Sequence, residues 1–265
     1  MHSLLQLARK YIIYYITASN GKGHGIHSPF IFDFVTNVLS DNRHFYSHET
    51  IESLRSQLLH DKTILNIEDF GAGTASGSSK QRTVSSIARH AAKSAKLCRL
   101  LFRIVHHYQP KTILELGTSL GISSAYMASA APGAKLITIE GASPVAKAAT
   151  KHHELLQLHN IQVITGKFED ILPGILHEMN TVDLAFVDGN HRFEPTKYYF
   201  EQLLSKAGAD SILIFDDIHW SEEMEDVWSV IKTDERVTAS IDLFFIGIVL
   251  FNSAFRSKQH FTIRF

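Results

Sequence analysis

The chain contains a single cysteine, Cys98, among its 265 residues. One cysteine excludes an intramolecular disulfide and is typical of a reducing compartment, so we expect a cytoplasmic protein in which Cys98 is a small buried apolar residue. An excess of charge of one sign is also missing, because 26 basic and 27 acidic residues leave a formal net charge of -1. Such a chain has no global field that attracts a polyanion, and we expect no nucleic acid partner.

Long hydrophobic runs are absent as well. The longest one, residues 243–251, is less than half of the roughly 20 residues that cross a bilayer as a helix, and it predicts a buried strand instead. Arg9 and Lys10 precede a short apolar stretch near the start of the chain, but the tyrosines of that stretch argue against a signal peptide. The sequence therefore predicts no membrane partner. A hydrophobic content of 45% is sufficient for a globular core.

Apolar strands alternate with helical segments from Thr112 onward, which predicts an α/β fold with a mostly parallel sheet. We expect strands at residues 112–116, 135–140, 161–165, 182–188 and 211–217, and helices at 123–131, 144–158, 168–179, 194–206 and 222–232. Two further strands, 237–244 and 246–251, have no long helix between them and predict an antiparallel hairpin at one edge of the sheet. The expected sheet has seven strands.

The first 96 residues are expected to form a mostly helical extension or lid that precedes a catalytic domain at residues 97–265. Helices predicted at 4–17, 29–39 and 50–60 surround two loops rich in glycine and serine. The first loop contains His24 and His27, whose spacing is compatible with metal ligation, although a lid or packing role is favoured. The second, DFGAGT at 69–74, is followed by a helical pattern instead of a strand. We assign it to structure or to a loop over an acceptor site.

The most informative stretch is TILELGTSLGISSAYMASA, residues 112–130, where a strand leads through a glycine turn into an apolar helix. Gly117 and Gly121 permit positive φ and a close approach of backbone to ligand, and the helix start presents free N–H groups. The spacing differs from the G-x-G-x-x-G pattern of dinucleotide sites. Glu115 would repel a pyrophosphate and attract an ammonium group, so its charge favours a cationic ligand over NAD.

A second acid, Glu140, ends the next expected strand in the sequence ITIEG. An acid at this strand tip is where ribose hydroxyls are held by paired hydrogen bonds. Two acids at successive strand tips strengthen the prediction of a nucleotide-type pocket. The alternative is that Glu140 is only a solvated strand end.

On these residues the sequence resembles the class I S-adenosylmethionine-dependent methyltransferases, specifically those similar to catechol and caffeoyl-coenzyme A O-methyltransferases. The resemblance covers about residues 97–220 and includes TGKFEDILP, LAFVDGNH and ILIFDDIHW. It implies a Rossmann-like fold, S-adenosylmethionine as cofactor and O-methylation of a small-molecule acceptor. By this resemblance the cofactor would be bound by Glu115, Gly117, Thr118, Gly121 and Ser123 on its methionine side, by Glu140 at its ribose, and by Gly166, Lys167 and Phe168 at its adenine, with Asp188 nearby.

Three acids follow two later strands: Asp188 in LAFVDGNH, and Asp216 and Asp217 in ILIFDDIHW. The carboxyl ends of parallel strands meet at one edge, so these carboxylates would repel one another unless a divalent cation joined them. Oxygen ligands favour Mg²⁺ or Ca²⁺ over zinc. The resemblance implies Asp, Asp and Asn at the metal site, so Asp217 adds a charge. Strand alternation points Asp216 and Asp217 to opposite faces, and Asp217 as the cap of the next helix is an equal alternative.

His191 occupies the position where catechol-type enzymes carry a lysine. With Asp188, it is the expected catalytic residue, because histidine suits a general base near neutral pH. With 16 histidines in the chain, an incidental loop histidine is the alternative. His219 and Trp220 are weaker candidates for the pocket wall.

Two other functions remain as alternatives from the sequence. A homodimer is also possible. A metal-dependent nucleotide-sugar transferase would need a basic group near Gly117, where Glu115 lies instead. A non-catalytic cofactor-binding protein would use the N-terminal extension to fill the acceptor cleft and bind a partner.

Overall fold

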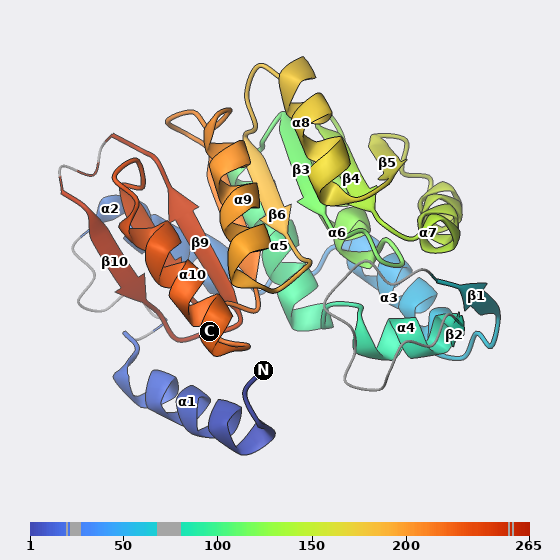
Figure 1. Cartoon of the computed structure of the whole chain (residues 1–265), viewed down its shortest axis with the longest axis horizontal. Coiled ribbons are helices and arrows are strands. Elements are labelled where there is room, and N and C mark those ends of the chain that lie inside the picture. Colours follow the sequence, from blue (N-terminus) through green and yellow to red (C-terminus); the bar gives the residue numbers. More distant parts are fainter. Residues whose placement is uncertain (20, 22–27, 68–80, 254, 256) are drawn as a thin grey trace. The chain divides into compact units, whose positions relative to one another are not determined.

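The computed structural model describes residues 1–19, 21, 28–67, 81–253, 255 and 257–265 (Figure 1). The chain divides into two compact units, one made of Met1–Asp41 with Leu176–Phe265 and the other of Asn42–Ile175. The predictions about His24, His27 and DFGAGT (69–74) fall outside the described residues. The predicted boundary between residues 96 and 97 stays a prediction.

The fold is α/β, as the alternating pattern predicts, and most of its strands belong to one mostly parallel sheet of eight strands. The additional strand is β10 (Gln259–Thr262), which pairs parallel with β8 (Ala239–Asp242). Its short sequence QHFT contains no apolar run, so hydrophobic periodicity did not predict a strand there. Within the expected helical extension, β1 (Ile64–Asn66) and β2 (Gln81–Thr83) form a small antiparallel pair that was also not predicted.

The unit Asn42–Ile175 is built on three neighbouring parallel strands: β3 (Thr112–Leu116), β4 (Lys135–Glu140) and β5 (Ile161–Thr165). Their bounds coincide with the predicted ones. The register pairs Leu116 with Ile139, so the loop after β3 begins beside Glu140 at the carboxyl ends of the strands. That edge is where open α/β sheets bind ligands.

The helices of this unit are α3 (Tyr46–Leu58), α4 (Val84–His90), α5 (Ala95–Tyr108), α6 (Ile122–Ala130), α7 (Ser143–Leu155) and most of α8 (Phe168–Glu178). The helical pattern predicted after DFGAGT corresponds to residues 82–96, which are divided between β2, α4 and the start of α5. Cys98 on α5 is fully buried, which confirms its prediction as a core residue. Burial raises the pKa of its thiol to about 12, although the nearby Arg55 guanidinium opposes this shift.

In the other unit the strands follow the order β10, β8, β9 (Ile246–Leu250), β7 (Ile212–Asp216) and β6 (Leu184–Val187). Strand β9 runs antiparallel to both β7 and β8, which confirms the predicted hairpin. Helices α9 (Phe193–Leu204) and α10 (Glu222–Thr233) lie side by side against these strands (Figure 1). One face of α10 is apolar and buried, and it is formed by Met224, Val227, Trp228 and Ile231.

The N-terminal helices of this unit follow local capping signals. Helix α1 (Leu4–Thr17) has the predicted bounds and begins with a capping box between Ser3 and Gln6. The predicted helix at 29–39 is present as α2 (Pro29–Asp33) continued by a π-helical turn, η1 (Phe34–Leu39), and the Ser28 side chain caps its start.

Candidate functional site

The glycine loop, residues 117–121, joins β3 to α6 through three residues of left-handed conformation. Gly117 has φ 108°, Ser119 has φ 48° and Gly121 has φ 81°. A Cβ atom on Gly121 would lie 2.4 Å from Nε2 of His153, so only glycine fits there. Gly121 is the N-cap of α6 and offers no side chain to its first turn, which leaves backbone N–H groups available for an anionic ligand group.

Glu115 lies fully buried beneath this loop. Its Oε1 accepts a hydrogen bond from the Ser123 hydroxyl and its Oε2 accepts one from Thr138, both at 2.6 Å. The Thr118 hydroxyl extends the network through a 2.6 Å contact with Thr138. These hydroxyls compensate the burial of a carboxylate. Glu115, Thr118 and Ser123 therefore lie in one internal network that supports the loop, and their contact with the methionine part of a cofactor stays a prediction.

Glu140 is half-buried and connects the end of β4 to the loop that follows β3. Its Oε2 accepts a hydrogen bond from Ser119 N–H at 2.8 Å, and its Oε1 accepts one from Ala142 N–H at 3.0 Å. Burial raises its pKa, although these backbone donors oppose the shift. Glu140 is therefore a fixed, half-buried carboxylate, and the alternative of a merely solvated strand end is wrong.

Two consecutive histidines of α7, which the sequence did not single out, hold the glycine loop from the side. His152 Nδ1 donates to the Leu120 carbonyl at 2.9 Å, and His153 Nε2 donates to the Gly121 carbonyl at 3.1 Å. Burial lowers the pKa of both rings, that of His153 to about 4. Neutral imidazoles therefore fix the loop, and nothing in the sequence indicates which carbonyls they meet.

Ser119 is a further candidate binding residue of the glycine loop, and the sequence motif did not indicate it. Its hydroxyl oxygen is buried and has no hydrogen-bond partner among the described residues. A buried hydroxyl without a partner in the protein is a candidate donor to a ligand atom.

The three residues predicted at the adenine follow β5, and the third of them, Phe168, is the first residue of α8. Gly166 has φ 155°, and its N–H donates to the Glu140 carbonyl at 3.0 Å. A Cβ atom there would come within 2.6 Å of the Ile171 side chain. Lys167 is exposed and Phe168 half-buried, so an apolar ring and a cation stand next to the strand that carries Glu140.

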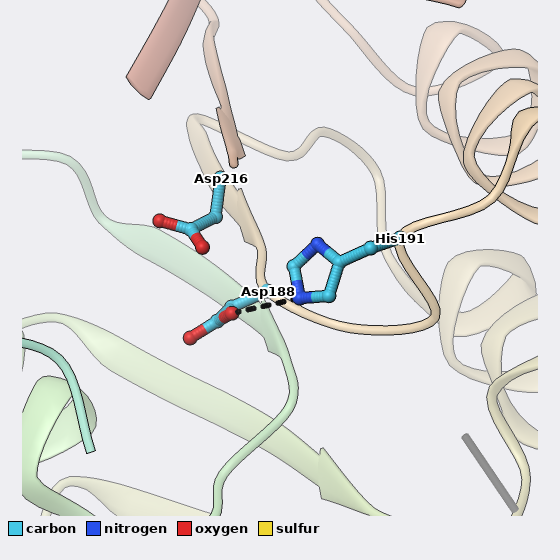
Figure 2. A group of neighbouring side chains, drawn as sticks. All are labelled: Asp188, His191 and Asp216. Atoms are coloured by element: carbon cyan, nitrogen blue, oxygen red, sulfur yellow. Dashed lines mark ion pairs between the residues drawn. The ribbon is translucent and has the colours of Figure 1, made fainter. Parts of the chain in front are cut away.

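In the other unit, Asp188, His191 and Asp216 form a cluster that we call the acid–histidine cluster. One ligand atom of each lies within 4.8 Å of the others (Figure 2). The pairing of Val187 with Phe215 brings the next residues, Asp188 and Asp216, beside each other at the ends of β6 and β7. His191 Nε2 is 3.6 Å from Asp188 Oδ1. Asp216 is buried, whereas Asp188 and His191 are half-buried.

This geometry fits a divalent cation. Ligands about 2.0 to 2.6 Å from one ion lie at most about 4 to 5 Å apart, which matches the spread of the cluster. Two adjacent carboxylates also repel each other, and a cation would relieve that repulsion.

Asp217 lies outside the cluster. Strand β7 ends at Asp216, and Asp217 turns away in a left-handed conformation, φ 54°, with its N–H donating to the Phe245 carbonyl at 2.7 Å. The N-cap of α10 is Ser221, so the alternative of Asp217 as a helix cap is wrong.

His219 has both ring nitrogens engaged, Nε2 with Asp242 at 2.8 Å and Nδ1 with Glu225 at 3.1 Å. Burial lowers its pKa, but these two carboxylates outweigh burial and raise it overall. When protonated, His219 therefore forms a structural ion pair with Asp242 and Glu225 within this unit. Whether His219 or Trp220 lines a pocket stays a prediction.

Comparison with known proteins agrees with these observations. Residues 114–218 match the family model of the methyltransferase domain. A catechol O-methyltransferase from Niastella koreensis is 34% identical over 113 residues, covering 42% of this chain and 50% of that protein. The bovine catechol O-methyltransferase is 29% identical over 126 residues, covering 45% and 46%. The chain thus spans about half the length of the curated relatives it matches.

Solved structures share the fold. An O-methyltransferase from Bacillus cereus in complex with SAH has a TM-score of 0.57 at 19% identity, over 82% of this chain and 96% of that one. The SAH-bound Podospora anserina methyltransferase has a TM-score of 0.59 at 14% identity, over 85% and 97%. The chain therefore shares the fold of these methyltransferases. Residues 114–218 are similar to the methyltransferase domain, and the curated relatives agree with the resemblance to the catechol O-methyltransferase-like proteins.

Proposed function

We propose that the chain is an S-adenosylmethionine-dependent methyltransferase that methylates a hydroxyl group of a small molecule. The observation that carries this proposal is the glycine loop fastened to Glu140, which offers backbone N–H groups and a fixed carboxylate at neighbouring strand ends. A relative named catechol O-methyltransferase and a structural neighbour crystallised with SAH support it.

The donor site is proposed on the unit Asn42–Ile175. The glycine loop and the first turn of α6 would bind the carboxylate of the methionine part, because a helix N-terminus favours an anion. Glu140 would accept hydrogen bonds from the ribose hydroxyls with the lone pairs that its backbone donors leave. Phe168 would pack on the adenine, with Gly166 and Lys167 beside it.

We propose that Glu115 acts on the cofactor without contacting it directly. Because its two oxygens already accept hydrogen bonds from Ser123 and Thr138, it would act through its negative charge from beneath the loop. This charge still favours a sulfonium or ammonium ligand over a pyrophosphate. The proposal of a nucleotide-sugar transferase gains nothing from this arrangement.

The acceptor chemistry is proposed for the acid–histidine cluster. Asp188 and Asp216 would hold a divalent cation such as Mg²⁺ or Ca²⁺, with Asp217 adding negative charge from the next residue. Such a cation, when bound, lowers the pKa of an acceptor hydroxyl. His191 would remove the hydroxyl proton, and its contact with Asp188 would orient the ring for this role.

The proposal is tested by methyl transfer from radiolabelled S-adenosylmethionine to a panel of catechols, phenols and aliphatic alcohols, with and without Mg²⁺. Calorimetry with S-adenosylhomocysteine runs in parallel. We expect micromolar binding and labelled product with at least one hydroxyl acceptor. Binding without product across the panel would instead favour a non-catalytic cofactor-binding protein, and absence of binding would refute the donor site itself.

A further inference from the structure

Helix α1 is attached to its own unit along one face. The Tyr14 hydroxyl donates to the Ile263 carbonyl, and the ring of Tyr11 packs against that of Phe244 with centroids 5.0 Å apart. The Lys10 ammonium lies 2.8 and 2.9 Å from the two oxygens of Glu225. These contacts repeat every three or four residues, so a single stripe of the helix faces the protein.

The opposite face of α1 is apolar and exposed. We call it the outer face and define it by Leu4, Leu5, Ala8, Ile12, Tyr15 and Ile16. The exposed fractions are 86% for Leu4, 85% for Leu5, 58% for Ile12 and 71% for Ile16. With 3.6 residues per turn, these positions share roughly one third of the helix circumference. A contiguous exposed apolar patch of this kind marks an interaction site.

The charge around the outer face identifies the kind of partner. The chain has no acidic residue before Asp33, and because Lys10 is paired with Glu225, the exposed charge of α1 beside the outer face is that of Arg9. Arg9 is exposed and borders the outer face, where its long side chain can reach an anionic headgroup while the apolar residues enter the lipid. A two-fold contact with a second copy would instead bring the Arg9 side chains together near mid-helix, with no acid of α1 to pair with them.

We propose that the outer face of α1 docks the protein on the surface of an anionic phospholipid membrane. Within the described residues, no helix is long and apolar enough to span a bilayer, so this contact is peripheral. Apolar runs as short as those of this sequence argue against a spanning segment. They leave open a helix that presents apolar residues to the protein on one face and to solvent on the other.

The test is co-sedimentation of the full chain with vesicles of phosphatidylcholine alone or mixed with phosphatidylglycerol. We expect pelleting with the anionic vesicles, and a fall of about ten-fold or more in the partition coefficient for the triple variant Leu5→Ser, Ile12→Ser and Ile16→Ser. A matched control replaces Ile64 and Leu155, which are 60% and 71% exposed in the other unit, by serine. This control should pellet like the parent chain, and circular dichroism verifies that all variants fold.

Three results would overturn the proposal. One is equal pelleting of the triple variant and the parent chain. Another is pelleting that does not depend on phosphatidylglycerol. The third is a dimer in light scattering that the triple variant loses, since that result assigns the outer face to a second copy.

Discussion

Glu140 accepts a hydrogen bond from the backbone N–H of Ser119 at 2.8 Å and thereby ties the end of β4 to the middle of the glycine loop. Ser119 has a positive φ, which costs free energy for a residue other than glycine. The carboxylate compensates part of that cost. One side chain thus shapes the loop and presents a charge at the proposed ribose position.

Glu140→Ala tests the proposed contact with the ribose. Loss of its charged hydrogen bonds should weaken binding of S-adenosylhomocysteine by about 1 to 3 kcal/mol in calorimetry. The exposed Glu154 on α7 provides a matched control, and Glu154→Ala should bind like the parent chain. Unchanged affinity of Glu140→Ala would place the ribose elsewhere.

The sequence predicted much of this site because local rules determine it. The spacing of Gly117 and Gly121 indicated a tight turn, and Glu140 was recognisable as the last residue of its strand. The burial of Glu115 could not be predicted from a local sequence pattern. Its partners Thr138 and Ser123 come from β4 and α6, and only the register that pairs Glu115 with Thr138 brings them together. The contacts of His152 and His153 likewise depend on how α7 packs, which a local pattern does not contain.

Gly121→Ala tests the close approach within the glycine loop. A methyl group there would meet the His153 ring and would also require an unfavourable φ. We expect the variant to lose about 1 to 3 kcal/mol of unfolding free energy in urea titrations and to bind S-adenosylhomocysteine more weakly. Gly133→Ala is the control, because a Cβ atom there has no neighbour within 4 Å. Equal stability of the two variants would contradict the prediction.

The buried ring of His153 should give stability a measurable pH dependence. Its pKa is about 4 in the folded protein and about 6.5 in the unfolded chain, so between these values only the unfolded state binds the proton. Stability therefore falls as pH falls through this window, by about 1.4 kcal/mol per pH unit from this group. Urea titrations from pH 7 to pH 4 should show a smaller slope for His153→Gln than for the parent chain. The exposed His159→Gln variant should keep the parental slope, and identical slopes for all three proteins would refute the assignment.

Asp216→Ala tests the proposed cation site. Because Asp216 is buried beside Asp188, its loss removes one of two carboxylates and should lower Mg²⁺-dependent turnover by about 10- to 100-fold or more. Binding of S-adenosylhomocysteine should stay within about two-fold and serves as the check of folding. Asp210→Ala, at an exposed position before β7, is the control. Full Mg²⁺-dependent activity in Asp216→Ala would exclude this carboxylate as a ligand.

His191 can act as a general base or as a third ligand of the cation, and His191→Ala separates the two roles. As a base it contributes to proton removal alone, so the variant should lose about 10²- to 10⁴-fold in turnover while the Mg²⁺ concentration for half-maximal rate stays unchanged. Added imidazole should restore part of the rate, because a free base can enter the space left by the ring. As a ligand, His191 would instead contribute to the affinity for the cation, and its loss would raise the Mg²⁺ concentration needed for half-maximal rate. The 3.6 Å separation of His191 Nε2 and Asp188 Oδ1 favours the base, since a neighbouring carboxylate can orient a neutral imidazole for proton removal. The exposed His177→Ala variant controls for nonspecific effects, and a shift of the Mg²⁺ requirement in His191→Ala alone would reassign the residue to the metal.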